Sequence, residues 1–119
     1  MQIFDSVLID DLRSFKEPKS GLILRSEETA LSWVSLLQPE DRIMELWLDH
    51  DLGEDTSGNP TSIMRVVRKL EELVFLGSAP FIGKVFVHTS NPVGGNQIEA
   101  ALGRHFPTHR VYAGNYFIA

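Results

Sequence analysis

Cysteine is absent from this sequence of 119 residues. Disulfide bonds and thiolate metal sites are therefore excluded, and redox chemistry gives no information about the compartment. The sequence also has no apolar run of the length that crosses a bilayer. Its first residues lack the basic region and apolar stretch of a secretory signal. These absences predict a cytoplasmic protein with no membrane partner.

Positive charge is scarce relative to negative charge. Eleven Lys and Arg residues stand against sixteen Asp and Glu residues, which gives a net charge of −5, and the basic residues are scattered along the chain. Nucleic-acid backbones are bound mainly through clustered Lys and Arg, so duplex nucleic acid is not an expected partner. With 43% hydrophobic residues the composition is that of an ordinary globular protein, and the length predicts a single domain over residues 1–119.

The sequence does contain a set of short apolar runs that end in polar residues. The clearest is residues 43–48, which continues directly into Asp49, His50 and Asp51. Short apolar runs rich in β-branched and aromatic residues are typical of buried strands. Strands are predicted over residues 6–9, 22–25, 43–48, 84–88 and 110–113.

Three amphipathic helices are predicted between these strands. Ser26 is a suitable N-cap for a helix that stops before Pro39. Pro60 suits the first position of a second helix that extends to Gly77, after a polar and mobile loop at residues 54–59. The apolar positions of the third helix are Ile98, Ala101, Leu102 and Phe106.

Alternating strands and helices predict a sheet of about five mostly parallel strands in the order 2-1-3-4-5, covered on both faces. The link between the first two strands, residues 10–21, is short for a helical crossover, so strand two is either parallel or the second half of a hairpin. Ligands of such sheets bind outside the carboxyl ends of the strands. The polar residues expected at these ends are Asp10, Asp11, Asp49, His50, His88 and Thr89.

Three motifs at these strand ends resemble the signatures of one protein family. Residues 9–13, 48–53 and 87–94 are similar to motifs of the cyclic-phosphate processing receiver (cREC) domains, a divergent relative of response-regulator receiver domains. The resemblance covers most of the chain and implies a receiver-like (flavodoxin-like) three-layer α/β sandwich whose first helix is lost or reduced. A phosphate-accepting receiver has a lysine after the fifth strand, but residues 112–115 contain none. Chemistry on a bound phosphate is therefore favoured over phosphorelay.

The acidic residues predict a metal site. Asp10, Asp11 and Asp49 at neighbouring strand ends would supply hard oxygen ligands to a divalent cation, Mg²⁺ or Mn²⁺. The alternative is that these carboxylates cap loop N–H groups. Three carboxylates at close range repel one another, so at least one is expected to have a raised pKa without metal.

Two imidazoles beside the carboxylates predict proton transfer. His50 and His88 are the candidate acid and base, and neighbouring carboxylates are expected to raise the pKa of both. For His88 a structural role at the end of an apolar strand is an equal alternative. The predicted substrate-binding residues are Arg13, Thr89, Ser90, Asn91, Gly94 and Gly95.

Each of these substrate contacts has a plainer alternative. The Gly-containing start of the third helix offers backbone donors to a phosphate, or is only a turn. Arg13 would bind phosphate through two bonds, or pair with Asp11 or Glu17. Asp51 is predicted to be a solvated loop charge, close enough to assist the metal.

Two functions from different classes follow. The first is a metal-assisted phosphoesterase that processes a cyclic phosphate, either a cyclic nucleotide or the 2′,3′-cyclic phosphate end of an RNA, which is the substrate class that the resemblance implies. The second is a non-catalytic receiver-like module that binds a nucleotide or a protein partner. Metal-dependent turnover separates them.

Overall fold

A computed structural model describes residues 1–112 and 117–118 of the chain. Its main sheet has five strands, all parallel, in the order β2-β1-β3-β6-β7. This is the predicted order, and because β2 pairs parallel with β1, the hairpin alternative for the second strand is wrong. The strands of this sheet are β1 (Ile3–Ile9), β2 (Leu22–Leu24), β3 (Arg42–Leu48), β6 (Phe81–Val87) and β7 (Thr108–Arg110). The part of the predicted fifth strand that falls on residue 113 lies outside the described residues.

Two of the helices in the described residues begin at a residue whose side chain caps them, and the helix predicted at Pro60 does not. Ser26 caps α1 (Glu27–Leu36) by accepting a hydrogen bond from the Thr29 amide at 3.1 Å, as predicted. Asn91 caps α3 (Pro92–Leu102) in the same way, and Phe106 lies beyond the end of that helix. None of the helices in the described part of the chain is long and apolar enough to cross a membrane.

The exception is Pro60, which does not start a helix. It lies in β5 (Pro60–Ser62), which pairs antiparallel with β4 (Asp51–Glu54), and α2 (Met64–Phe75) begins after this hairpin. The predicted polar loop is therefore the tip of a hairpin. Gly53 and Gly58 have φ angles of 77° and 80°, a left-handed conformation that glycine adopts without strain. These two glycines let the chain reverse, so that Pro60 sits opposite Glu54.

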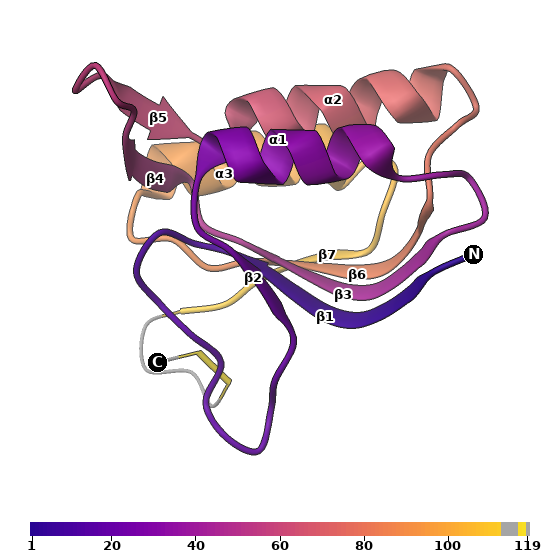
Figure 1. Cartoon of the computed structure of the whole chain (residues 1–119), viewed down its shortest axis with the longest axis horizontal. Helices are drawn as coiled ribbons and strands as arrows, with labels where there is room; N and C mark the ends of the chain where they lie inside the picture. Colours follow the sequence, from indigo (N-terminus) through magenta and orange to yellow (C-terminus); the bar gives the residue numbers. More distant parts are fainter. Residues whose placement is uncertain (113–116, 119) are drawn as a thin grey trace.

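The sheet has helices on one face and irregular chain on the other. All three helices lie on the same side of the strands, and the link between β1 and β2 lies on the opposite side with residues 117–118 (Figure 1). On this second face Trp47 stacks on Phe86 with ring centroids 4.2 Å apart. Phe15 of the link pairs with Ile118 near the C-terminus. The third layer is therefore built from loops and aromatic side chains, in keeping with the predicted loss of the first receiver helix.

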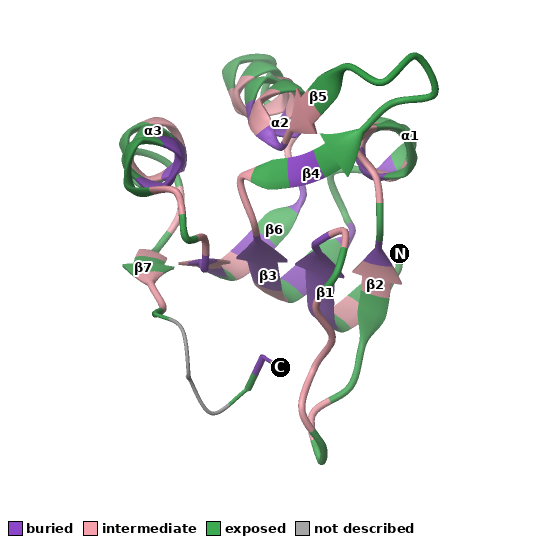
Figure 2. Ribbon diagram, turned by 90° about the vertical axis from the view of Figure 1, so that its left-hand side faces the viewer, coloured by how far each residue is buried: buried purple, intermediate pink, exposed green. Residues whose placement is uncertain are grey.

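The carboxyl ends of the strands are in register. Backbone hydrogen bonds continue one residue beyond the strands, from Asp10 to Leu24 O at 3.1 Å, from Asp49 to Ile9 O at 3.1 Å, and from His88 to Leu48 O at 3.0 Å. Side chains of a strand alternate between faces. Asp10, Asp49 and His88 follow Leu8, Trp47 and Phe86 by two positions, so all three extend on the face away from the helices. Figure 2 shows the buried ends of β1 and β3 beneath this edge.

Candidate active site

Three carboxylates meet at the carboxyl edge of the sheet. One ligand oxygen from each of Asp10, Asp11 and Asp49 lies within 4.8 Å of the others. Asp10 is 1% exposed, and its Oδ1 accepts hydrogen bonds from the amides of Leu12 at 2.8 Å and Arg13 at 2.9 Å. Its Oδ2 is buried and has no hydrogen-bond partner among the residues that the structure describes. One oxygen of Asp10 thus caps the turn, as the plainer alternative predicted, while the other remains available to a ligand.

Asp49 shows the expected effect of crowded negative charge. Burial and, after it, the charge of Asp10 raise its pKa to about 6, against the opposing effect of a hydrogen bond from Thr89. The expectation that one carboxyl has a raised pKa is confirmed, although burial contributes more than repulsion. A cation beside Asp49 would favour its ionised form.

His88 lies between Asp10 and Arg13. The ring is 3% exposed, its Nε2 is 3.6 Å from Asp10 Oδ2, and its Nδ1 is 3.4 Å from Arg13 Nη1. A guanidinium only donates, so Nδ1 is the acceptor here and the proton of the neutral ring is on Nε2, facing Asp10. Arg13 is thus directed at the imidazole.

The expected rise in the pKa of His88 is wrong. The pKa of His88 is lowered to about 4, first by burial; the charge of Asp10 opposes this, and the charge of Arg13 adds a smaller lowering. The cost of ionising an imidazole at a buried position exceeds the attraction of one carboxylate. His88 is therefore neutral at neutral pH.

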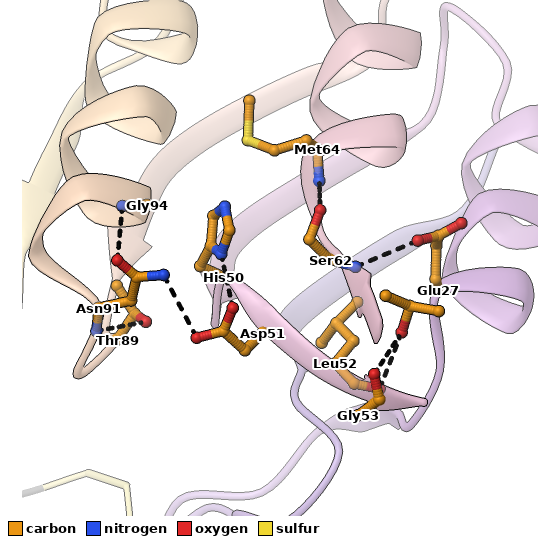
Figure 3. Close-up of polar contacts among 11 residues, drawn as sticks. Glu27, His50, Asp51, Leu52, Gly53, Ser62, Met64, Thr89, Asn91 and Gly94 are labelled. Atoms are coloured by element: carbon orange, nitrogen blue, oxygen red, sulfur yellow. Dashed lines mark hydrogen bonds and ion pairs between the residues drawn. The ribbon is translucent and has the colours of Figure 1, made fainter. Parts of the chain in front are cut away.

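His50 belongs to a second group of residues next to the carboxylates. Its Nδ1 lies 2.9 Å from Asp51 Oδ1, and the other oxygen of Asp51 accepts a bond from the Asn91 side-chain amide at 3.5 Å (Figure 3). Thr89 connects the two groups, because its hydroxyl bonds to Asp49 and accepts from the Asn91 amide. Asp51 is exposed, as predicted, but it also orients the imidazole. The signal for this role was its position directly after His50.

The start of α3 packs closely against His50, which follows β3, and against Arg110, the last residue of β7. The Gly94 amide donates to Asn91 Oδ1 at 3.0 Å, and the Gly95 amide donates to Asn91 O at 2.9 Å. Both amides are thus engaged within the helix. What these glycines provide is space, because a Cβ on Gly94 would collide with the His50 ring and one on Gly95 would lie 2.6 Å from the Arg110 guanidinium carbon. Ser90 is exposed beside them.

The β4–β5 hairpin closes one side of the site. Glu27 of α1 accepts a hydrogen bond from the Ser62 amide at 3.2 Å and pairs with Arg65 at 2.8 Å, which fixes β5 against two helices. Figure 3 shows the Glu27 contact and Gly53, which lies in β4. A Cβ on Gly53 would lie 3.2 Å from Asp11 Oδ2, so the hairpin backbone lies directly against one of the three carboxylates.

The chain matches the model of a known family. The family model described as the cyclic-phosphate processing receiver domain matches residues 6–104. This span contains all three motifs and every predicted site residue, so the resemblance suggested by the motifs is confirmed. No curated protein and no solved structure matches the chain.

Proposed function

The chain belongs to the family of cyclic-phosphate processing receiver domains, and from this premise we propose that it is a metal-assisted phosphoesterase acting on a cyclic phosphate. The substrate would be a cyclic nucleotide or the 2′,3′-cyclic phosphate end of an RNA. One observation carries the proposal: two buried atoms without hydrogen-bond partners, Asp10 Oδ2 and His88 Nε2, lie 3.6 Å apart beside two further carboxylates. Unpartnered buried polar atoms are costly for a fold, and they are typical of sites that are completed by a ligand.

The donor set fits a divalent cation. Carboxylate oxygens are the ligands that Mg²⁺ and Mn²⁺ prefer, and Asp10, Asp11 and Asp49 offer three of them together with a free buried oxygen. The raised pKa of Asp49 supports the same conclusion, because an ionised carboxylate here is costly until a cation meets it. A bound cation would neutralise the negative charge of the substrate phosphate.

Arg13, Thr89 and Ser90 would hold the phosphate. The Arg13 guanidinium reaches the centre of the site, where it contacts His88 at 3.4 Å. A guanidinium binds two phosphate oxygens at once, so an arriving substrate offers it a better partner than an imidazole. Ser90 would donate from its hydroxyl, and Thr89 would do so by turning its hydroxyl proton from Asp49 to the phosphate. Asn91, Gly94 and Gly95 form the adjacent helix start, and direct contact of these three residues with the phosphate stays a prediction.

His88 and His50 would move the protons. When Arg13 turns to the phosphate, the lone pair of His88 Nδ1 becomes free to take a proton from an attacking water. The water oxygen bonds to phosphorus while the ester bond to one ring oxygen breaks, and His50 Nε2 gives a proton to that leaving oxygen. Asp51 orients His50 from its other nitrogen at 2.9 Å. Asp10 holds His88 from the Nε2 side.

Turnover with and without metal tests the proposal. The purified protein is incubated with 2′,3′-cyclic and 3′,5′-cyclic nucleotides in the presence of Mg²⁺, Mn²⁺ or a chelator, and the linear phosphate product is measured. We expect metal-dependent product from the parent and from Asp5→Asn, which alters an exposed aspartate of β1. Asp49→Asn should form little product. Nucleotide binding without turnover under any metal condition would instead support a non-catalytic binding module.

A further inference from the structure

We propose that Arg25 is a positioning residue that fixes the turn at residues 10–14 and thereby presents Arg13 to the phosphate. The inference rests on the proposed function for the role of Arg13. Arg25 itself contacts none of the groups assigned to proton transfer. Its role follows from its place in the sheet, from the three groups to which it donates, and from what the turn carries.

Arg25 occupies the same row of the sheet as the site residues. It follows Leu24, which is paired with Ile9, and Ile9 is paired with Leu48. The residues that come next on these three strands are Arg25, Asp10 and Asp49. The Asp10 amide also donates to Leu24 O at 3.1 Å, which ties the end of β1 to the residue before Arg25.

The guanidinium of Arg25 donates hydrogen bonds to three groups of the turn at residues 10–14. Its Nη1 donates to the backbone oxygens of Asp10, at 3.4 Å, and of Arg13, and its Nη2 donates to Ser14 Oγ at 2.9 Å. From inside the same turn, Asp10 Oδ1 accepts from the amides of Leu12 and Arg13. The carboxylate therefore engages the amides of the turn, while the guanidinium engages its carbonyls and a hydroxyl.

The turn carries two groups that the proposed chemistry needs. One is the Arg13 side chain, which lies against His88. The other is the free Oδ2 of Asp10, whose direction depends on the position of Oδ1 in the turn. If Arg25 were removed, the carbonyls of Asp10 and Arg13 would lose their shared donor, and the turn would sample other conformations. Arg13 would then spend less time where a phosphate is bound.

The variant Arg25→Lys separates the effect of the guanidinium geometry from the effect of the positive charge. A guanidinium has five donors in a rigid planar fork, whereas an ammonium is a compact charge on a flexible stem. Arg25→Lys keeps the positive charge near the carboxylates but is not expected to bridge three acceptors. Arg25→Gln removes both features. Arg68→Gln is the matched control, because it removes the same charge from an exposed position of α2.

Amide hydrogen exchange tests the positioning without substrate or metal. In Arg25→Gln and Arg25→Lys we expect exchange at the amides of Leu12 and Arg13 to be faster by about tenfold or more, with the amides of α2 unchanged. Arg68→Gln should leave the turn as it is in the parent. Unchanged exchange at Leu12 and Arg13 in the Arg25 variants would overturn the inference, whether or not the protein proves to be a phosphoesterase.

A double-mutant cycle tests the route through Arg13. With 2′,3′-cyclic AMP and Mg²⁺, Arg25→Gln should raise KM by about tenfold with a smaller change in kcat, because substrate binding is weakened before chemistry. In an Arg13→Gln background the same change should have little further effect. Full additivity of the two changes would show that Arg25 does not act through Arg13. If the parent shows no turnover, the proposed function fails and the exchange measurement alone decides the role of Arg25.

Discussion

Buried aspartates stand at both ends of the sheet, under opposite conditions. At the amino end, Asp41 precedes β3, is 5% exposed, and accepts bonds from the amides of Gln2 at 2.9 Å and Gln38 at 2.8 Å. These hydrogen bonds, first that of Gln38 and then that of Gln2, lower its pKa. At the carboxyl end, Asp10 is 1% exposed and has one oxygen without a partner. Both carboxylate oxygens of Asp41 thus accept hydrogen bonds within the fold, whereas one oxygen of Asp10 accepts none from the described residues.

This contrast indicates that Asp41 contributes to stability, whereas the carboxylates at the other end of the sheet serve a function. A carboxylate that accepts backbone amides on both oxygens stabilises the turn that it joins. Carboxylates that are buried and crowded together are costly to ionise, and burial first, then the charge of Asp10, raises the pKa of Asp49 to about 6. Arrangements of the second kind are concentrated at sites that bind ligands. The two ends should therefore respond in opposite ways to the same kind of substitution.

The largest expected effect is on turnover at the carboxyl end. His88→Ala should lower the rate by roughly two to four orders of magnitude, because it removes the proposed base. The change in melting temperature should be small, since His88 Nε2 has no hydrogen bond to lose and Nδ1 has only a long one, of 3.4 Å, from Arg13. Steady-state rates and thermal melts of the same preparation check both statements. His50→Ala should give a similar loss of rate, because it removes the proposed acid.

A different result would reassign His88. If His88→Ala strongly lowers the melting temperature while the folded fraction keeps its specific activity, the residue is a structural part of the edge. The acid–base assignment would then be wrong, and the metal-binding carboxylates alone would remain as candidates for chemistry.

The next effect in size is on stability at the amino end. Asp41→Asn should lower the melting temperature by about 5 °C or more, because an NH₂ group would replace one acceptor opposite a backbone N–H. Turnover per folded molecule should be unchanged, since Asp41 is at the other end of the sheet. A loss of turnover without a change in the melt would contradict the division between the two ends.

The pH dependence of this difference has a definite sign. The pKa of Asp41 is lowered from its ordinary value of 3.8, so its contribution to stability is complete above that pH and is lost as pH falls through the lowered value. The gap in melting temperature between the parent and Asp41→Asn should be constant near neutral pH and shrink below about pH 4. Melts across this range check the prediction, and a gap that widens in acid would contradict it.

The smallest effect is expected for Asp49 without metal. At pH 7.5, Asp49→Asn should raise the melting temperature by about 3 °C, because it removes a half-buried charge that nothing in the free protein balances well. Mg²⁺ or Mn²⁺ should raise the melting temperature of the parent and change that of Asp49→Asn much less. Asp5→Asn, the exposed control, should follow the parent. An equal metal shift in all three proteins would remove Asp49 from the site.

Several elements were predictable because their signals are local. The cap at Ser26 depends on one hydroxyl and one nearby amide, and the strands around Leu8, Trp47 and Phe86 are short continuous apolar runs, which are typical of strands buried on both faces. Pro60 shows the limit of this reasoning. A proline after a polar loop fits a helix start, but here the glycines at positions 53 and 58 turned the chain back into a hairpin, whose pairing places Pro60 opposite Glu54.

In the candidate site, too, some features follow from local sequence and others depend on the tertiary structure. The residue types at the strand ends were visible in the sequence, because an apolar run that stops at Asp or His marks both a strand and its exit from the core. The state of those residues was not visible. The lowered pKa of His88, the free oxygen of Asp10 and the hold of Arg25 on the turn depend on neighbours that are distant in sequence. Burial and hydrogen bonding act through space, and only the packed sheet decides which of these groups meet.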